Sequence, residues 1–140
     1  MKSAVVDPGF LIGLFDESDA LHRRCRAFLR EYPGRFLTTE AALAQTLALL
    51  SPAQQLRCLE WLGKAAQAGL LTVNPEPIDL RAVENLARKH PGRAVDLAEA
   101  TLVLLAEQTG VGEILAADRR DYDAYGLGDR VRFIDLPEES

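Results

Sequence analysis

The sequence predicts an α/β fold, a three-layer sandwich with a mostly parallel central sheet of four to five strands. The alternation of its elements predicts this fold, and two further observations bear on the site and on the number of domains. Short apolar runs alternate with helices or pairs of helices, as in sheets that helices cover on both faces. Two of these runs, AVVD and ILAAD, end in an aspartate, Asp7 and Asp118. The 140 residues, of which 48% are apolar, suffice for one core, so we expect a single domain over residues 1–140.

Five short runs have the apolar and β-branched residues that are typical of buried strands, and turn residues bound them. Pro33-Gly34 precedes the second run, Asn74-Pro75 ends the third, and Gly110 precedes the fourth. The predicted strands are Ser3 to Val6, Arg35 to Leu37, Leu70 to Val73, Glu113 to Ala116 and Arg132 to Ile134.

Apolar residues at helical spacing predict the helices between these strands. The sequence Ser51-Pro52-Ala53-Gln54 is typical of a helix start, because it offers a cap, a proline at the first position and a glutamine that closes a capping box. The predicted helices are Phe10 to Phe15, Asp19 to Arg30, a helix capped by Thr39 that contains Leu43, Leu47 and Leu50, a helix from Pro52 to about Ala68, Asp79 to Lys89, and Asp96 to Gln108.

The net charge of −5 and the pI of about 5.0 argue against a broad basic surface that binds nucleic acid through phosphate contacts alone. Local basic patches remain, at residues 22–26 and at Arg119-Arg120. No apolar run approaches the roughly 20 residues that span a bilayer, so we expect no membrane association. We find no signal-peptide pattern, and we expect Cys25 and Cys58 to be reduced thiols in a cytoplasmic protein.

Carboxylates follow two of the predicted strands. Because ligands of parallel sheets gather at the carboxyl ends of strands, Asp7 and Asp118 are candidate partners in one site. Asp7 also has a structural interpretation, since Asp-Pro-Gly is a common helix start with an aspartate cap. Asp118 has one too, as part of a polar turn.

A second pair of acids, Asp96 and Glu99, lies three residues apart and therefore on one helix face. A capping box at the start of a helix explains the same spacing, and both interpretations stay open. Clustered carboxylates suit hard ions such as Mg²⁺ or Mn²⁺, which activate water for phosphodiester hydrolysis. Acids at several strand ends, with basic residues nearby, therefore indicate nuclease chemistry.

Four stretches in this order resemble the PIN domain family, and within it the VapC-like toxin ribonucleases. They span nearly the whole chain. The stretches are VVDPGFLIGLFDESDALHRRC, LTTEAALAQTLALL, AVDLAEATLVLLAEQTG and ILAADRRDYDAYG. The resemblance implies a PIN-like fold and a Mg²⁺- or Mn²⁺-dependent endoribonuclease that hydrolyses RNA.

The resemblance assigns roles to individual positions. Asp7 matches the first acid of the family and Asp118 the fourth, and Glu99 stands where the third is usually an aspartate. These three are the implied catalytic and metal-binding residues, and Asp96 and Asp121 are the implied further metal ligands. Arg119 or Arg120 would contact substrate phosphate.

The second acid of the family is missing. It is usually a glutamate, and Gln45 stands at that position as a weak or outer participant in substrate binding. Glu40 does not replace it, because five residues along a helix is about 500° of rotation. Pro8 and Ala116 also depart from the pattern. These departures leave a second hypothesis open, a PIN-like module that cleaves weakly or not at all and binds RNA or a protein.

The resemblance also implies partners. A toxin of this type would pair with an antitoxin protein and form a homodimer. The apolar helices from Leu47 to Trp61 are the candidate dimer surface.

Overall fold

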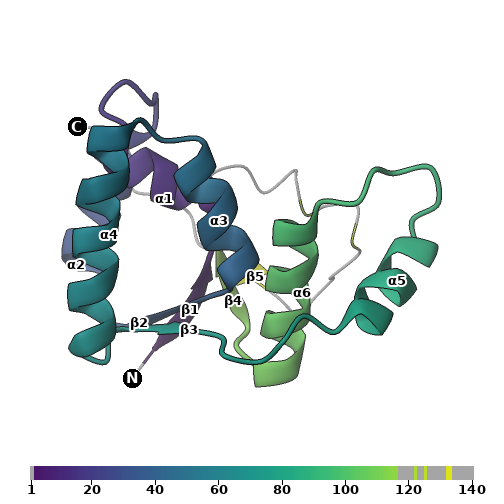
Figure 1. Cartoon of the computed structure of the whole chain (residues 1–140). Helices are drawn as coiled ribbons and strands as arrows, with labels where there is room; N and C mark the ends of the chain where they lie inside the picture. The colour runs from purple at the N-terminus through teal and green to yellow at the C-terminus, as the bar shows by residue number, and fades with distance from the viewer. Residues whose placement is uncertain (1, 117–121, 123–124, 126–131, 134–140) are drawn as a thin grey trace.

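The computed structural model describes residues 2–116, 122, 125 and 132–133 (Figure 1). Its sheet has five strands, all parallel, in the order β3-β2-β1-β4-β5. This confirms the predicted parallel sheet, and five strands is the upper of the two numbers expected. The strands are β1 (Ser3–Val6), β2 (Arg35–Thr38), β3 (Leu71–Val73), β4 (Glu113–Leu115) and β5 (Arg132–Phe133).

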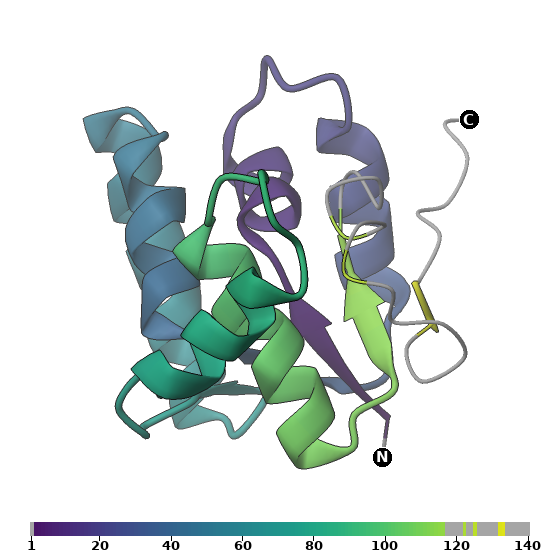
Figure 2. The ribbon, with the colours of Figure 1, turned by 90° about the vertical axis from the view of Figure 1, so that its right-hand side faces the viewer.

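Helices cover both faces of the sheet, and the side chains of β1 alternate between the two layers. Ala4 and Val6 belong to the core with α1, α2 and α4, whereas Val5 belongs to the core with α5 and α6. Figure 2 shows α5 and α6 in front of the sheet. The helices are α1 (Pro8–Phe15), α2 (His22–Glu31), α3 (Glu40–Ala48), α4 (Pro52–Gln67), α5 (Leu80–Arg88) and α6 (Leu97–Thr109).

The helix ends follow the local chemistry of the sequence. Thr39 caps α3, and Ser51 and Gln54 form the predicted capping box at the start of α4. Gly110 ends α6 in the left-handed conformation, at φ 69°, which glycine adopts without strain. The predicted start of α2 at Asp19 is wrong, because the Asp19 carboxylate accepts a hydrogen bond from the Leu21 backbone N–H and holds a turn there instead.

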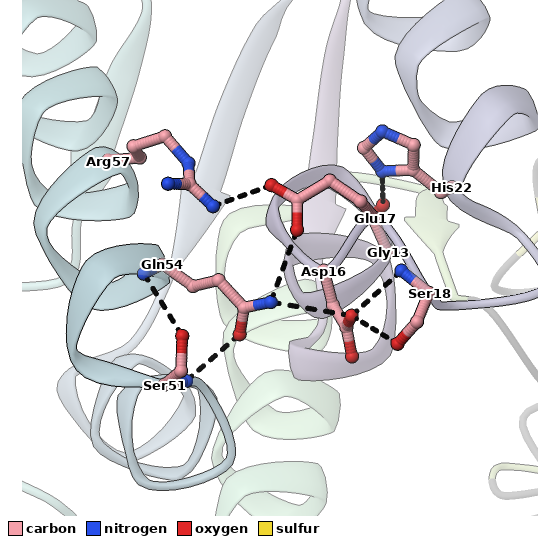
Figure 3. Close-up of polar contacts among 8 residues, drawn as sticks. All are labelled: Gly13, Asp16, Glu17, Ser18, His22, Ser51, Gln54 and Arg57. Atoms are coloured by element: carbon pink, nitrogen blue, oxygen red, sulfur yellow. Dashed lines mark hydrogen bonds and ion pairs between the residues drawn. The ribbon is translucent and has the colours of Figure 1, made fainter.

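The loop between α1 and α2 is tied to the first turns of α4 by polar contacts (Figure 3). Gln54 donates from its amide to both Asp16 and Glu17, and Arg57 forms an ion pair with Glu17. His22 bonds through Nδ1 to the Gly13 carbonyl at 2.7 Å. Because the ion pair is largely exposed, its contribution to stability is small, and the cluster mainly fixes the path of the loop.

Both cysteines are free and buried, which confirms the expected thiols. Burial raises the pKa of the Cys25 thiol to about 12 and that of Cys58 to about 11. None of the helices in the described residues is long and apolar enough to span a membrane.

Candidate active site

The carboxyl ends of β1 and β4 lie side by side, as the sequence predicts. Val6 pairs with Leu115 in the parallel ladder, and the Asp7 backbone N–H donates to the Leu115 carbonyl at 3.3 Å. Asp7 therefore lies beside the end of β4, where Ala116 leaves the strand. Asp118, Arg119, Arg120 and Asp121 follow two to five residues later in the sequence and lie outside the described residues.

Asp7 is almost fully buried, with 4% of its surface exposed, and both of its carboxylate oxygens are engaged. Oδ1 accepts from the Phe10 backbone N–H at 2.9 Å and caps α1. Oδ2 accepts from the Tyr122 hydroxyl at 3.3 Å. The structural interpretation of Asp7 as a helix cap is thus correct, but the cap uses only one oxygen and leaves the other for contacts across the sheet edge.

Asp96 and Glu99 divide their roles at the start of α6. Asp96 is the cap, since its Oδ1 accepts from the Glu99 backbone N–H at 3.0 Å. The Glu99 side chain accepts from the Arg93 guanidinium and from the Tyr125 hydroxyl, each at 3.4 Å. Only 15% of that side chain is exposed, so its charge is held against Arg93 in a partly desolvated place.

Two tyrosines from the segment after β4 connect the two acids. The Tyr122 hydroxyl contacts Asp7, the Tyr125 hydroxyl contacts Glu99, and the two rings lie 6.4 Å apart between centroids. This distance is within the range of interacting aromatic pairs. The structure therefore brings two of the three predicted catalytic acids to one end of the sheet, through residues that sequence analysis did not select.

Two further side chains, Arg93 and His90, lie against the Tyr125 ring. The Arg93 guanidinium lies 5.0 Å from the centre of the Tyr125 ring, and the His90 ring meets it edge-on at 5.5 Å. Burial, followed by the nearby Glu99 carboxylate, raises the pKa of the Tyr125 hydroxyl, so it stays a hydrogen-bond donor at neutral pH. Nothing in the sequence near His90 and Arg93 indicates this cluster; the only signal is the spacing of the two tyrosines, three apart after a strand-end aspartate.

The position of the missing acid is on α3. Gln45 is half-buried there, and within the described part of the chain its side chain has no hydrogen bond to Asp7 or Glu99. Glu40 lies at the first position of the same helix and is exposed. The described residues contain no group of three acidic, histidine or cysteine side chains able to hold a metal. Asp7, Asp96 and Glu99 thus form the described part of the predicted acidic set.

No protein-family model matches the chain, and no curated protein matches it. Among solved structures, the chain is similar to VapC20 of Mycobacterium tuberculosis, a sarcin-ricin loop cleaving toxin. The two share 23% identity, with a TM-score of 0.71 over 90% of this chain and 97% of VapC20. The fold is that of a VapC toxin. This confirms the PIN-like fold that the four sequence blocks predict.

Proposed function

We propose that the protein is a metal-dependent endoribonuclease of the VapC toxin type that acts in the cytoplasm and hydrolyses RNA phosphodiester bonds. The observation that carries the proposal is that Tyr122 contacts Asp7 and the neighbouring Tyr125 contacts Glu99 at one end of the sheet. The fold is shared with VapC20, a sarcin-ricin loop cleaving toxin. Parallel sheets bind their ligands at this end.

The side chains of the site fit Mg²⁺ or Mn²⁺, because the available ligands are carboxylate oxygens. Asp7, Glu99 and Asp118 would hold the ion, with Asp96 and Asp121 as further ligands. When bound, the metal would supply the activation of water and the stabilisation of charge on the phosphodiester. The protein's own part is to orient the acids, which Tyr122 and Tyr125 do, and to bind phosphate through Arg119 or Arg120.

Cleavage of a mixed RNA pool by the purified protein tests the proposal. We expect cutting with Mn²⁺ or Mg²⁺, and loss of cutting in EDTA and in the Asp118→Asn variant. Asp7→Asn should abolish cutting while keeping the fold, because asparagine caps a helix as well as aspartate does. Asp79→Asn is the matched control: Asp79 caps α5 in the same way, through the Ala82 backbone N–H at 3.0 Å, and lies outside the acidic site. Equal activity of the Asp7 and Asp79 variants would refute the assignment.

A second function is a PIN-like module that binds RNA or a protein without cleaving. Two observations favour it: Gln45 is neutral where the family has an acid, and the Glu99 charge is already compensated by Arg93. This alternative predicts a folded protein that binds RNA in EDTA and shows no metal-dependent cutting. Robust turnover by the pure protein would eliminate it.

Homodimerisation and pairing with an antitoxin follow from the toxin proposal. Within the predicted dimer segment, Leu56 and Leu59 of α4 are 59% and 51% exposed. Trp61 is a poor probe of that surface, because it packs against Phe15 and Phe36 inside the protomer.

We therefore predict that Leu56→Ser/Leu59→Ser shifts the sedimentation profile toward monomer. The control is Leu80→Ser at the start of α5, where the leucine is 69% exposed and lies outside the predicted segment. A wild-type protein that already sediments as a monomer, or an unchanged double variant, would contradict a dimer through α4.

A further inference from the structure

A groove of about 520 Å³ lies beyond the ends of β2 and β3. Its walls are the start of α3 from Thr39 to Ala41, the segment from Asn74 to Asp79, and the side chains of Thr101, Leu104 and Gln108 on α6. Thr39 and Thr101 are buried and share a hydrogen bond at 2.9 Å, which holds α3 and α6 together at this point. The volume is within the range of ligand-binding clefts.

This groove is separate from the candidate active site. Successive helix residues turn by 100°, so Thr101, Leu104 and Gln108 share one side of α6, and Glu99 points to the other. Asp7, Tyr122 and Tyr125 do not line it. Its occupant therefore does not have to be the substrate of the proposed nuclease.

Among the described residues, the groove is lined by charge of one sign. Three carboxylates line it, those of Glu40, Glu76 and Asp79, and the described lining residues include no lysine or arginine. Asp79 is engaged as the cap of α5. No ion pair among the described residues involves Glu40 or Glu76. A phosphate-bearing ligand such as RNA would meet uncompensated repulsion here, whereas a cationic ligand would gain from all three groups.

Apolar surface lies between the carboxylates. Ile78 is 39% exposed, Leu104 is half-buried, and Pro75 and Pro77 flank Glu76. The two prolines fix their own φ angles and remove two backbone donors, so this wall is rigid before any ligand arrives. Rigid apolar surface beside acidic groups suits a side chain with a long apolar stem and a positive end, which is the chemistry of arginine and lysine.

We propose that this groove binds a basic peptide segment of a partner protein, with arginine or lysine side chains directed to Glu40 and Glu76 and apolar neighbours packed on Ile78 and Leu104. The groove is much larger than a metal ion requires, and the described residues offer no metal-binding group there. The charge complementarity selects a basic segment over an acidic or neutral one.

Fluorescence anisotropy with a labelled hexapeptide of alternating arginine and leucine tests the proposal, with the glutamate-leucine hexapeptide as the negative probe. The double variant Glu40→Gln/Glu76→Gln should bind the basic peptide about tenfold more weakly than the wild type, as expected for two lost ion pairs. The matched control is Glu31→Gln/Glu60→Gln, which changes the net charge equally at two exposed residues outside the groove. This control should bind within twofold of the wild type.

Equal weakening in the two double variants would show that the peptide responds only to overall charge, and the proposal would be wrong. The same holds if neither variant changes the affinity. Methyl NMR gives a second readout that does not depend on substitution. Peptide addition should shift the Ile78 and Leu104 methyl signals, and shifts at Leu56 and Leu59 without them would place the peptide on α4 and overturn the assignment.

Discussion

Replacing Tyr122 by phenylalanine isolates the contact that joins the segment after β4 to the end of β1. Tyr122 is 1% exposed, and its hydroxyl donates to the buried Asp7 carboxylate. Phenylalanine keeps the ring, so no cavity forms around it and only the hydroxyl is lost. The carboxylate then loses a donor in a place where water has little access.

The structure sets the size of the effect. Hydrogen bonds to charged groups contribute about 1.5–3 kcal/mol, but the 3.3 Å separation is longer than the roughly 2.7–2.8 Å of a strong O–H···O bond. We therefore expect Tyr122→Phe to lower the free energy of unfolding by about 1 kcal/mol. For a chain of this length, that corresponds to a fall in Tm of roughly 3 °C.

A double-mutant cycle assigns this loss to the pair, because both residues make further contacts. Asp7→Ser serves as the partner variant: serine still caps α1, and its short side chain has no second oxygen for Tyr122. In the Asp7→Ser background, Tyr122→Phe should cost almost nothing. Urea unfolding followed by circular dichroism measures all four proteins. A coupling energy within about 0.3 kcal/mol of zero would refute the contact as an energetic link.

Three further predictions follow from local structure. Gly34→Ala should destabilise the protein by about 2 kcal/mol, because the new Cβ would lie 2.5 Å from the Lys2 carbonyl oxygen and 2.6 Å from the Tyr32 ring. Gly63→Ala should stabilise it by about 0.5–1 kcal/mol, because its Cβ meets open space within α4. Urea unfolding compares the two variants, and a change of the same sign in both would contradict the packing. The buried thiols stay protonated in the folded state, whereas unfolded thiols ionise near their ordinary pKa. The free energy of unfolding should therefore fall as pH rises from about 9 through 11. Replacing both Cys25 and Cys58 by alanine should remove this part of the pH dependence. Gln45→Glu should raise the rate of Mn²⁺-dependent RNA cleavage by about tenfold if Gln45 stands at the missing acid, and an unchanged rate would remove it from the site.

The fold was predictable because most of its signals are local. Caps at Thr39, Ser51 and Asp79 act within three residues, and alternation in β1 divides Val5 from Ala4 and Val6 without reference to distant parts of the chain. The start of α2 was missed for a local reason too. Aspartate is a common helix cap, but the Asp19 carboxylate accepts from the Leu21 backbone N–H, two residues ahead, and so closes a turn before the helix begins.

Of the candidate site, only the part whose position follows from the order of the strands, and not from side-chain contacts, could be predicted from the sequence. The rule that parallel strands end at one edge places Asp7 beside the end of β4. No such rule predicts that Arg93 and Tyr125 contact Glu99. Arg93 lies in the loop before α6, Glu99 in the first turn of α6, and Tyr125 in the segment after β4. Tyrosine and arginine have many ordinary surface roles, so a single sequence gives no reason to prefer these two.

Glu99 stands where the PIN resemblance implies an aspartate, and its contacts bear on the proposed metal site. An aspartate at position 99 would have a shorter arm, whereas the glutamate extends far enough for Oε1 to accept from both Arg93 and Tyr125. The charge of a carboxylate held in this way is offset by Arg93 without a metal. Under the proposed nuclease function, a metal that took Glu99 as a ligand would compete with Arg93 for it. A nuclease built on this arrangement would require a higher metal concentration for activity than one with four free carboxylates. A binding module would require no metal.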